Sequence, residues 1–121
     1  MKNAVIYARH IGYRTYEKTV DEQIVAAQEF AKASGYEVVG IYSDDYPTKQ
    51  PRYAQYEQML SDEKKSDWRT IIVYGAFQLG RNSDKTIRLM RYLHHKGKEL
   101  IFVPQGDNNL NRFLKLLEAL I

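Results

Sequence analysis

The run Ala4-Val5-Ile6-Tyr7-Ala8 decides the fold of this chain. Three further apolar runs follow it, at residues 38–42, 70–74 and 100–103. All four are continuous rather than alternating and contain β-branched residues, a pattern typical of strands that are buried on both faces of a sheet. The runs therefore predict a sheet that lies between two layers of helices.

Each run is followed by a stretch whose apolar residues have helical spacing, which predicts helices that begin near residues 20, 51, 82 and 109. Ser34-Gly35 and Lys96-Gly97 are signals for the ends of the first and third helices. The predicted core-facing stripes are Val20, Ile24, Ala27 and Ala31 in the first helix, Tyr53, Tyr56 and Leu60 in the second, and Ile87, Met90 and Leu93 in the third.

Alternation of strands and helices with short connections indicates right-handed parallel βαβ units. We therefore expect an α/β fold, a three-layer sandwich with a mostly parallel sheet of four or five strands flanked by helices. The length of 121 residues predicts a single domain over residues 1–121.

The composition excludes several classes of protein. The chain has no cysteine, so thiol catalysis, disulfides and thiolate metal sites are ruled out. No signal peptide or membrane span is recognisable, and a cytoplasmic location is the expectation. The 18 basic and 15 acidic side chains give a net charge of +3, which permits a nucleic-acid partner without requiring one.

Ligands of open parallel sheets bind beyond the carboxyl ends of the strands, which directs attention to the loops expected at 9–18, 43–51, 75–82 and 104–108. Arginines recur there, and guanidinium groups match phosphate oxygens in a bidentate manner, so one interpretation is a phosphate-sized anion site. The other is that they are solvated loop residues paired with Asp44, Asp45 and Asp84. The arginines are Arg9, Arg14, Arg52 and Arg81.

Common nucleotide and metal motifs are missing from the sequence. It contains neither Gly-x-Gly-x-x-Gly after the first strand nor Gly-x-x-x-x-Gly-Lys-Ser/Thr. The ends of the first and third strands carry Arg9 and Gly75-Ala76 instead of the carboxylate cluster of a phospho-acceptor domain. His94 and His95 are adjacent and are expected on the surface. Together with His10 they do not make a metal cluster. We expect no cofactor and no metal site.

Taken in order, these features resemble the amino-terminal catalytic domain of the serine site-specific recombinases, the resolvase/invertase family, which has a flavodoxin-like sheet. The resemblance covers almost the whole chain. It is carried by the segments Val5-Ile6-Tyr7-Ala8-Arg9, Asp21-Glu22-Gln23, Gly35-Tyr36-Glu37-Val38-Val39, Tyr42-Ser43-Asp44-Asp45, Gln58-Met59-Leu60, Val73-Tyr74 and Leu79-Gly80-Arg81-Asn82.

The resemblance implies phosphoryl transfer on DNA without a metal, in which a serine attacks a phosphodiester that several arginines hold. That serine follows the first arginine, here Arg9, by two residues, and its position is occupied by Ile11. The family's Asp-Arg-x-Gly-Arg segment reads Phe77-Gln78-Leu79-Gly80-Arg81, so only its last arginine remains. A further family arginine aligns with Tyr53, next to Arg52. An intact cleavage mechanism is therefore not expected.

Another hydroxyl in the expected loops could replace the nucleophile, although such residues are more often caps or turns. The candidates are Thr15, Ser43, Thr48 and Ser83.

The end of the chain departs from the family as well. Family members continue into a long dimer helix and a DNA-reading domain, so the chain is expected to be truncated within that helix. Its last segment is apolar around more than one stripe, which fits either a buried helix or a partner-binding one. The interface candidates are Phe113, Leu116, Leu117 and Leu120.

Three functions stay open at this point. The chain is a degenerate resolvase of DNA recombination that binds DNA phosphates weakly, or a module that associates with itself or with an active recombinase, or a flavodoxin-like domain that binds a small anion.

Overall fold

A computed structural model describes residues 2–11, 19–46, 54–74 and 83–103. Along the chain these form β1 (Lys2–Ile11), α1 (Val20–Ala33), β2 (Tyr36–Tyr46), α2 (Ala54–Glu63), β3 (Thr70–Tyr74), α3 (Ser83–His95) and β4 (Glu99–Val103). The helix expected over 109–121 lies outside the described residues.

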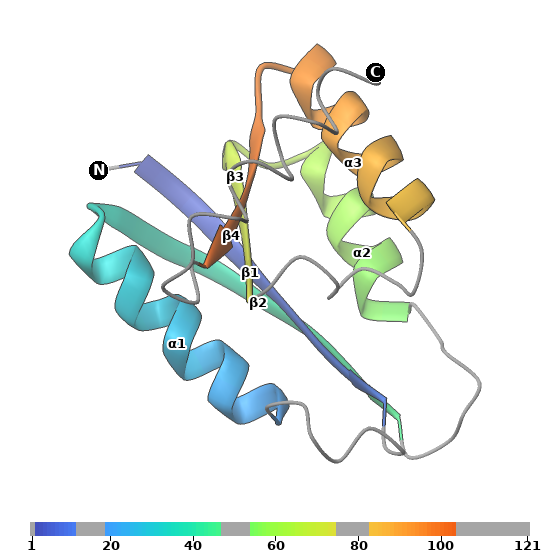
Figure 1. Cartoon of the computed structure of the whole chain (residues 1–121). Helices are drawn as coiled ribbons and strands as arrows, with labels where there is room; N and C mark the ends of the chain where they lie inside the picture. Colours follow the sequence, from blue (N-terminus) through green and yellow to red (C-terminus); the bar gives the residue numbers. More distant parts are fainter. Residues whose placement is uncertain (1, 12–18, 47–53, 75–82, 104–121) are drawn as a thin grey trace.

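The described strands form one parallel sheet in the order β2-β1-β3-β4. Helix α1 covers one face, and α2 and α3 cover the other (Figure 1). The three-layer α/β sandwich expected from the sequence is confirmed.

Local signals set the limits of the first helix. The Thr19 hydroxyl accepts a hydrogen bond from the Glu22 N–H at 3.2 Å, and the Glu22 carboxylate accepts one from the Thr19 N–H at 3.1 Å. This capping box satisfies two backbone donors that the first helical turn leaves open. The helix ends before Gly35, whose φ of 80° suits a residue without a side chain.

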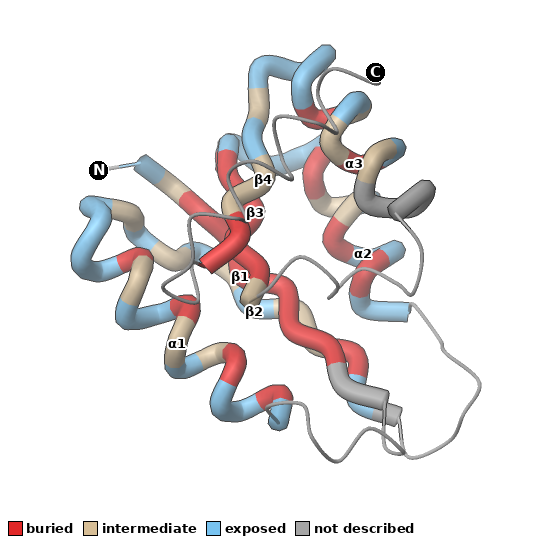
Figure 2. The backbone as a smooth tube through the Cα atoms, viewed as in Figure 1, coloured by how far each residue is buried: buried red, intermediate tan, exposed pale blue. Residues whose placement is uncertain are grey.

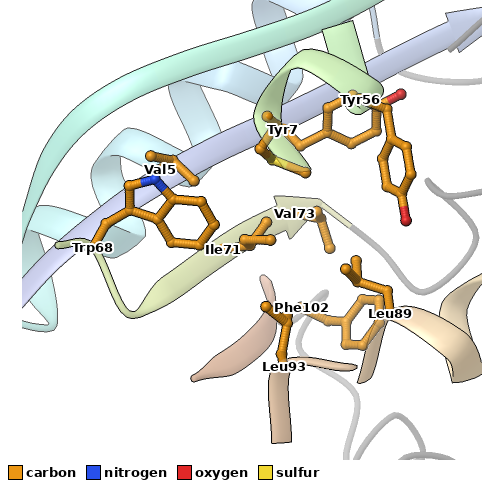
Figure 3. Close-up of a cluster of buried hydrophobic side chains, with 10 residues drawn as sticks. Val5, Tyr7, Tyr56, Trp68, Ile71, Val73, Leu89, Leu93 and Phe102 are labelled. Carbon is orange, nitrogen blue, oxygen red and sulfur yellow. The ribbon is translucent and has the colours of Figure 1, made fainter. Parts of the chain in front are cut away.

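Two hydrophobic clusters, one on each face of the sheet, make up the core, and β1 and β3 contribute to both (Figure 2). The cluster on the α2–α3 face contains the larger side chains, several of them aromatic (Figure 3). The cluster on the α1 face is built from small and branched residues: Ala4, Ile6, Ala27, Ala31, Ile72 and Val103. Small residues on α1 allow that helix to approach the sheet closely.

Strands β1 and β2 extend further than their apolar runs. The register pairs Tyr7 with Val73 at the last β1–β3 position, but residues 8–11 of β1 continue in register with residues 43–46 of β2. This two-stranded ribbon continues for about 13 Å at the usual rise per residue. The loops expected at 9–18 and 43–51 therefore start too early, because backbone pairing holds these polar residues in strands.

Strand β2 is one of the two edge strands of the described sheet, and its exposed residues overturn the expectation that all four strands are buried on both faces. Val39 and Ile41 are 48% and 44% exposed. The register shifts so that Ala4 pairs with Val38 and Val5 with Gly40, which leaves Val39 as a bulge. Bulges at sheet edges interrupt the row of groups that another strand could pair with.

Candidate functional site

The direction of the strand order reverses between β1 and β3. From β1 the chain proceeds to β2 on one side of the sheet, and the later strands β3 and β4 lie on the other side. The carboxyl ends of the two strands at such a reversal flank the usual ligand crevice. Arg9 lies near the end of β1, and residues 75–82 follow β3 directly. Arg14, Arg52 and Arg81 lie outside the described residues.

The backbone of Arg9 is fixed by a buried side chain of α1. The Gln23 Nε2 donates to the Arg9 carbonyl at 2.8 Å, and the Arg9 N–H donates to Gln23 Oε1 at 3.0 Å. Gln23 is 1% exposed. A buried amide that makes both bonds holds the strand end at a set distance from α1.

Arg9 itself is a buried residue, with 5% of its surface exposed. The interpretation of Arg9 as a solvated loop side chain is therefore wrong, because it belongs to a paired strand rather than to a loop. Its register partner on β2 is Asp44, which is also buried, whereas the neighbouring Asp45 is exposed. Alternation along the strands places Arg9 and Asp44 on the same face as Tyr7, beneath α2.

Asp44 links β2 to the start of α2. Its carboxylate accepts hydrogen bonds from the Tyr7 hydroxyl at 2.7 Å, from the Gln55 N–H at 3.0 Å and from the Tyr56 N–H at 3.1 Å. A carboxylate at this place satisfies free amides of the first helical turn and interacts favourably with the helix dipole. We call Tyr7, Arg9, Gln23 and Asp44 the strand-end cluster.

The strand-end cluster can hold charge and position the backbone. Its described side chains include no hydroxyl nucleophile other than the Tyr7 phenol, and that hydroxyl donates a hydrogen bond to Asp44. Strand β1 ends at Ile11, two residues beyond Arg9. Within the described ranges, no three His, Asp or Glu side chains are grouped to hold a metal ion.

The roles of Gln23 and Asp44 were not predicted from the sequence. Gln23 falls within the apolar face of the first helix, and a polar residue at such a position signals a buried hydrogen-bonding role. Asp44 follows an apolar strand and precedes a helix, which is a signal for a cap, but its partners lie more than ten residues away.

A second polar group lies at the amino ends of the strands, on the same face of the sheet. Lys98 Nζ lies 3.2 Å from Glu63 Oε1 and 4.5 Å from the centre of the Trp68 ring. The Tyr92 hydroxyl donates to Glu63 Oε2 at 2.9 Å. We call Glu63, Trp68, Tyr92 and Lys98 the Trp68 cluster.

The Trp68 cluster balances its own charges. Burial alone would raise the pKa of the Glu63 carboxyl, but the hydrogen bonds from Tyr92 and Lys98 and the charges of Lys98 and Lys96 outweigh burial and lower that pKa below its usual value. The hydrogen bond to Glu63, together with burial, raises the pKa of Tyr92. This balance is what a structural ion pair requires.

Some of the remaining residues predicted from the sequence lie within the described ranges, and others lie outside them. His94 and His95 are exposed at the end of α3, as expected. Val103 is the last described residue, so the interface candidates Phe113, Leu116, Leu117 and Leu120 lie outside the described residues. None of the helices in the described ranges is long and apolar enough to cross a membrane.

Together these features define a class: a parallel α/β domain with a buried arginine and a buried carboxylate at the strand ends. Comparison with known families identifies it further. The family model for the resolvase N-terminal domain matches residues 4–121, so the chain belongs to the resolvase family. A search of curated proteins finds no significant match.

Solved structures share the fold over nearly the whole chain. The N-terminal catalytic domain of TP901-1 integrase is 23% identical with a TM-score of 0.76, over 98% of this chain and 93% of that one. A resolvase family site-specific recombinase from Streptococcus pneumoniae is 20% identical with a TM-score of 0.73, over 99% and 85%. The C-terminal catalytic domain of ISC1926 TnpA, an IS607-like serine recombinase, is 19% identical with a TM-score of 0.66, over 93% and 77%. The fold is that of a serine recombinase catalytic domain.

Proposed function

We propose that this resolvase-family domain takes part in DNA recombination without cutting DNA itself. The observation that carries the proposal is Ile11, which occupies the position that the family resemblance gives to the nucleophilic serine. A hydrocarbon side chain has no atom that can attack phosphorus, and covalent catalysis by this route is lost. Phe77 and Gln78 replace two further charged residues of the family pattern, so we expect the loss to extend beyond the nucleophile.

Residual DNA binding would depend on the arginines at the strand ends. Arg9 is held at the end of β1 by Gln23, and the segments that carry Arg14 and Arg81 follow β1 and β3 in the sequence. We expect these arginines and Arg52 to supply the positive charge that a DNA phosphate needs. Contacts to phosphates alone give weak, salt-dependent and sequence-independent binding.

A covalent-adduct assay tests the loss of cleavage. The protein is incubated with a pool of nicked suicide duplexes of varied sequence, and an intact serine recombinase on its own site is the positive control. We expect no denaturation-resistant adduct from the wild-type chain or from Ile11→Ser. An adduct from the wild-type chain would show that another hydroxyl acts as nucleophile and would refute the proposal. An adduct from Ile11→Ser alone would show that the rest of the machinery is intact.

Salt-dependent DNA binding tests the arginines. Affinity of a labelled duplex is measured by anisotropy at several salt concentrations, and Arg81→Ala and Arg52→Ala should each lower the slope of log affinity against log salt by about one. Arg69→Ala is the matched control, since Arg69 is exposed at the amino ends of the strands. An unchanged slope in the first two variants would contradict a phosphate site.

A second candidate function is association with another recombinase chain or with a second copy. The apolar residues Phe113, Leu116, Leu117 and Leu120 favour it, because they occupy more than the single stripe needed for docking on a sheet. Leu117→Asp should convert a dimer to a monomer in light scattering. A wild-type protein that is monomeric at all concentrations would exclude self-association.

A further inference from the structure

A groove of about 440 Å³ lies between α2 and α3, on the outer surface of the domain. We call it the α2–α3 groove and define it by Tyr56, Leu60, Lys64, Arg88, Leu89 and Tyr92. Its volume falls in the range of roughly 300–1,000 Å³ that is usual for binding sites. The proposed DNA contacts do not use it, and Tyr56 joins it to the strand-end cluster, because the Tyr56 N–H donates to Asp44.

The floor of the groove is apolar and held in place. Leu89 and Tyr56 are 2% and 6% exposed, and the Tyr56 ring packs edge-on against Tyr7 with ring centres 5.5 Å apart. The Tyr92 hydroxyl is bound to the buried Glu63, which leaves the Tyr92 ring as part of the wall. Such a floor is preorganised, so a ligand would not have to order it.

The rim of the groove is positively charged. The charged side chains that line it are Lys64, in the turn directly after α2, and Arg88 on α3, both exposed. Arg91 and His95 continue the exposed face of α3 from Arg88 at helical spacing. In the described part of the chain, Lys64, Arg88 and Arg91 make no ion pair.

We propose that the α2–α3 groove binds an amphipathic helix of a partner protein, with an apolar stripe bordered by acidic residues. An apolar stripe would fill the floor, as in other helix-in-groove complexes. Glutamate or aspartate beside the stripe would meet the cations of the rim, which gives specificity and faster association. The apolar floor favours a helix over a DNA backbone, because a sugar-phosphate chain has no side chain with which to fill it.

A designed peptide provides the probe: a helix of about four turns with leucines along one face and glutamates at the borders, labelled for anisotropy. A matched peptide has lysines in place of the glutamates. We expect the acidic peptide to bind and the basic one to bind at least several-fold more weakly. Lys64→Glu and Arg88→Glu should each weaken binding of the acidic peptide by about threefold to fivefold, as for an exposed ion pair. Lys32 is exposed on α1, which covers the opposite face of the sheet. Lys32→Glu is therefore the control and should bind the peptide as the wild type does.

Other occupants of the α2–α3 groove would give different results in these measurements. Equal binding of both peptides, or equal affinity of Arg88→Glu and Lys32→Glu, would overturn the proposal. Displacement of the peptide by duplex DNA at the same salt, with loss of DNA binding in Arg88→Glu, would identify the cations as a nucleic-acid surface instead. Self-association that Arg88→Glu abolishes would identify the occupant as a second copy. The adduct assay addresses a different site, so either proposal can fail alone.

Discussion

The two polar clusters, which lie at opposite ends of the strands, solve the burial of charge in different ways. In the Trp68 cluster an acid and a base lie 3.2 Å apart and neutralise each other. In the strand-end cluster, the Gln23 amide and the Asp44 carboxylate bind backbone groups of Arg9, Gln55 and Tyr56. The first arrangement fastens side chains to one another, whereas the second fixes the backbone.

If the proposed function holds, this difference separates a structural end of the sheet from a functional one. The backbone bonds of the strand-end cluster hold residues from which the chain leads to the segments carrying Arg14 and Arg52. A site that must present several arginines to one anion requires such positioning. The predictions that follow test the contrast between the two clusters, in order of decreasing effect.

The largest effect is expected from Lys98→Met in the Trp68 cluster. It leaves the Glu63 carboxylate buried without its cation, which should lower the free energy of unfolding by about 2–4 kcal/mol. Urea unfolding followed by far-UV circular dichroism measures the change. The double variant Glu63→Gln/Lys98→Met should recover part of the loss, since no buried charge is left. A single variant as stable as the wild type would contradict a structural role for the pair.

A smaller loss is expected from Asp44→Ala in the strand-end cluster. The change leaves the Tyr7 hydroxyl and the Gln55 and Tyr56 amides without their acceptor and should lower the free energy of unfolding by about 2 kcal/mol. Hydrogen exchange should speed up selectively at the two α2 amides. Glu37→Ala, an exposed carboxylate on the same strand, serves as control and should change stability by less than about 0.5 kcal/mol. Equal effects of both variants would refute the capping role.

Gln23→Met is expected to lower the free energy of unfolding by about 1–2 kcal/mol, because it removes both hydrogen bonds to the Arg9 backbone while keeping the volume of the side chain similar. The matched control is Gln28→Met on the exposed face of the same helix. If both variants unfold at the same urea concentration, the backbone clamp contributes nothing.

The smallest effect is a difference in alkaline stability. Tyr42 lies on β2 between the clusters and donates to Asp62 Oδ2 at 2.6 Å. Burial, together with the hydrogen bond to Asp62 and its charge, raises the pKa of Tyr42 to about 12. The folded state thus holds the phenol proton more tightly than the unfolded chain, and this stabilisation is complete below about pH 10 and is lost as the pH rises towards about 12.

Tyr42→Phe removes that proton linkage. The difference in unfolding free energy between wild type and Tyr42→Phe should shrink between about pH 10 and pH 12. Unfolding in urea at several alkaline pH values measures it. Parallel loss of stability in both proteins would show that Tyr42 titrates as an ordinary tyrosine.

Much of the fold could be predicted because each strand core is a local apolar run and the first and third helices carry local stop signals. The predictions failed where contacts between residues far apart in the sequence determine the local structure. The polar ends of β1 and β2 are held in strands by each other, which propensity does not detect. Met59 and Leu89 are fully or nearly buried, but the predicted stripes do not include them. The orientation of each helix on the sheet determines which of its apolar residues face the core, and the sequence alone does not give that orientation.

The candidate site was predictable in part. The strand-end position of Arg9 follows from the alternation of strands and helices, and the family resemblance points to Ile11. The burial of Arg9 and its contacts with Gln23 depend on packing between β1 and α1. The cap that Asp44 provides depends on the approach of α2 to β2. Neither contact has a local signature in the sequence.

The position of Trp68 gives the protein a built-in optical reporter. It is the only tryptophan in the chain, it is 2% exposed, and the Lys98 ammonium lies over its ring. Its emission should therefore be blue-shifted in the native state and move to longer wavelength when this end of the sheet opens. Trp68 lies at the end of the domain away from the strand-end cluster, so a ligand at that cluster would not contact the indole directly. A change in emission on titration of such a ligand would therefore reveal coupling between the two ends of the sheet.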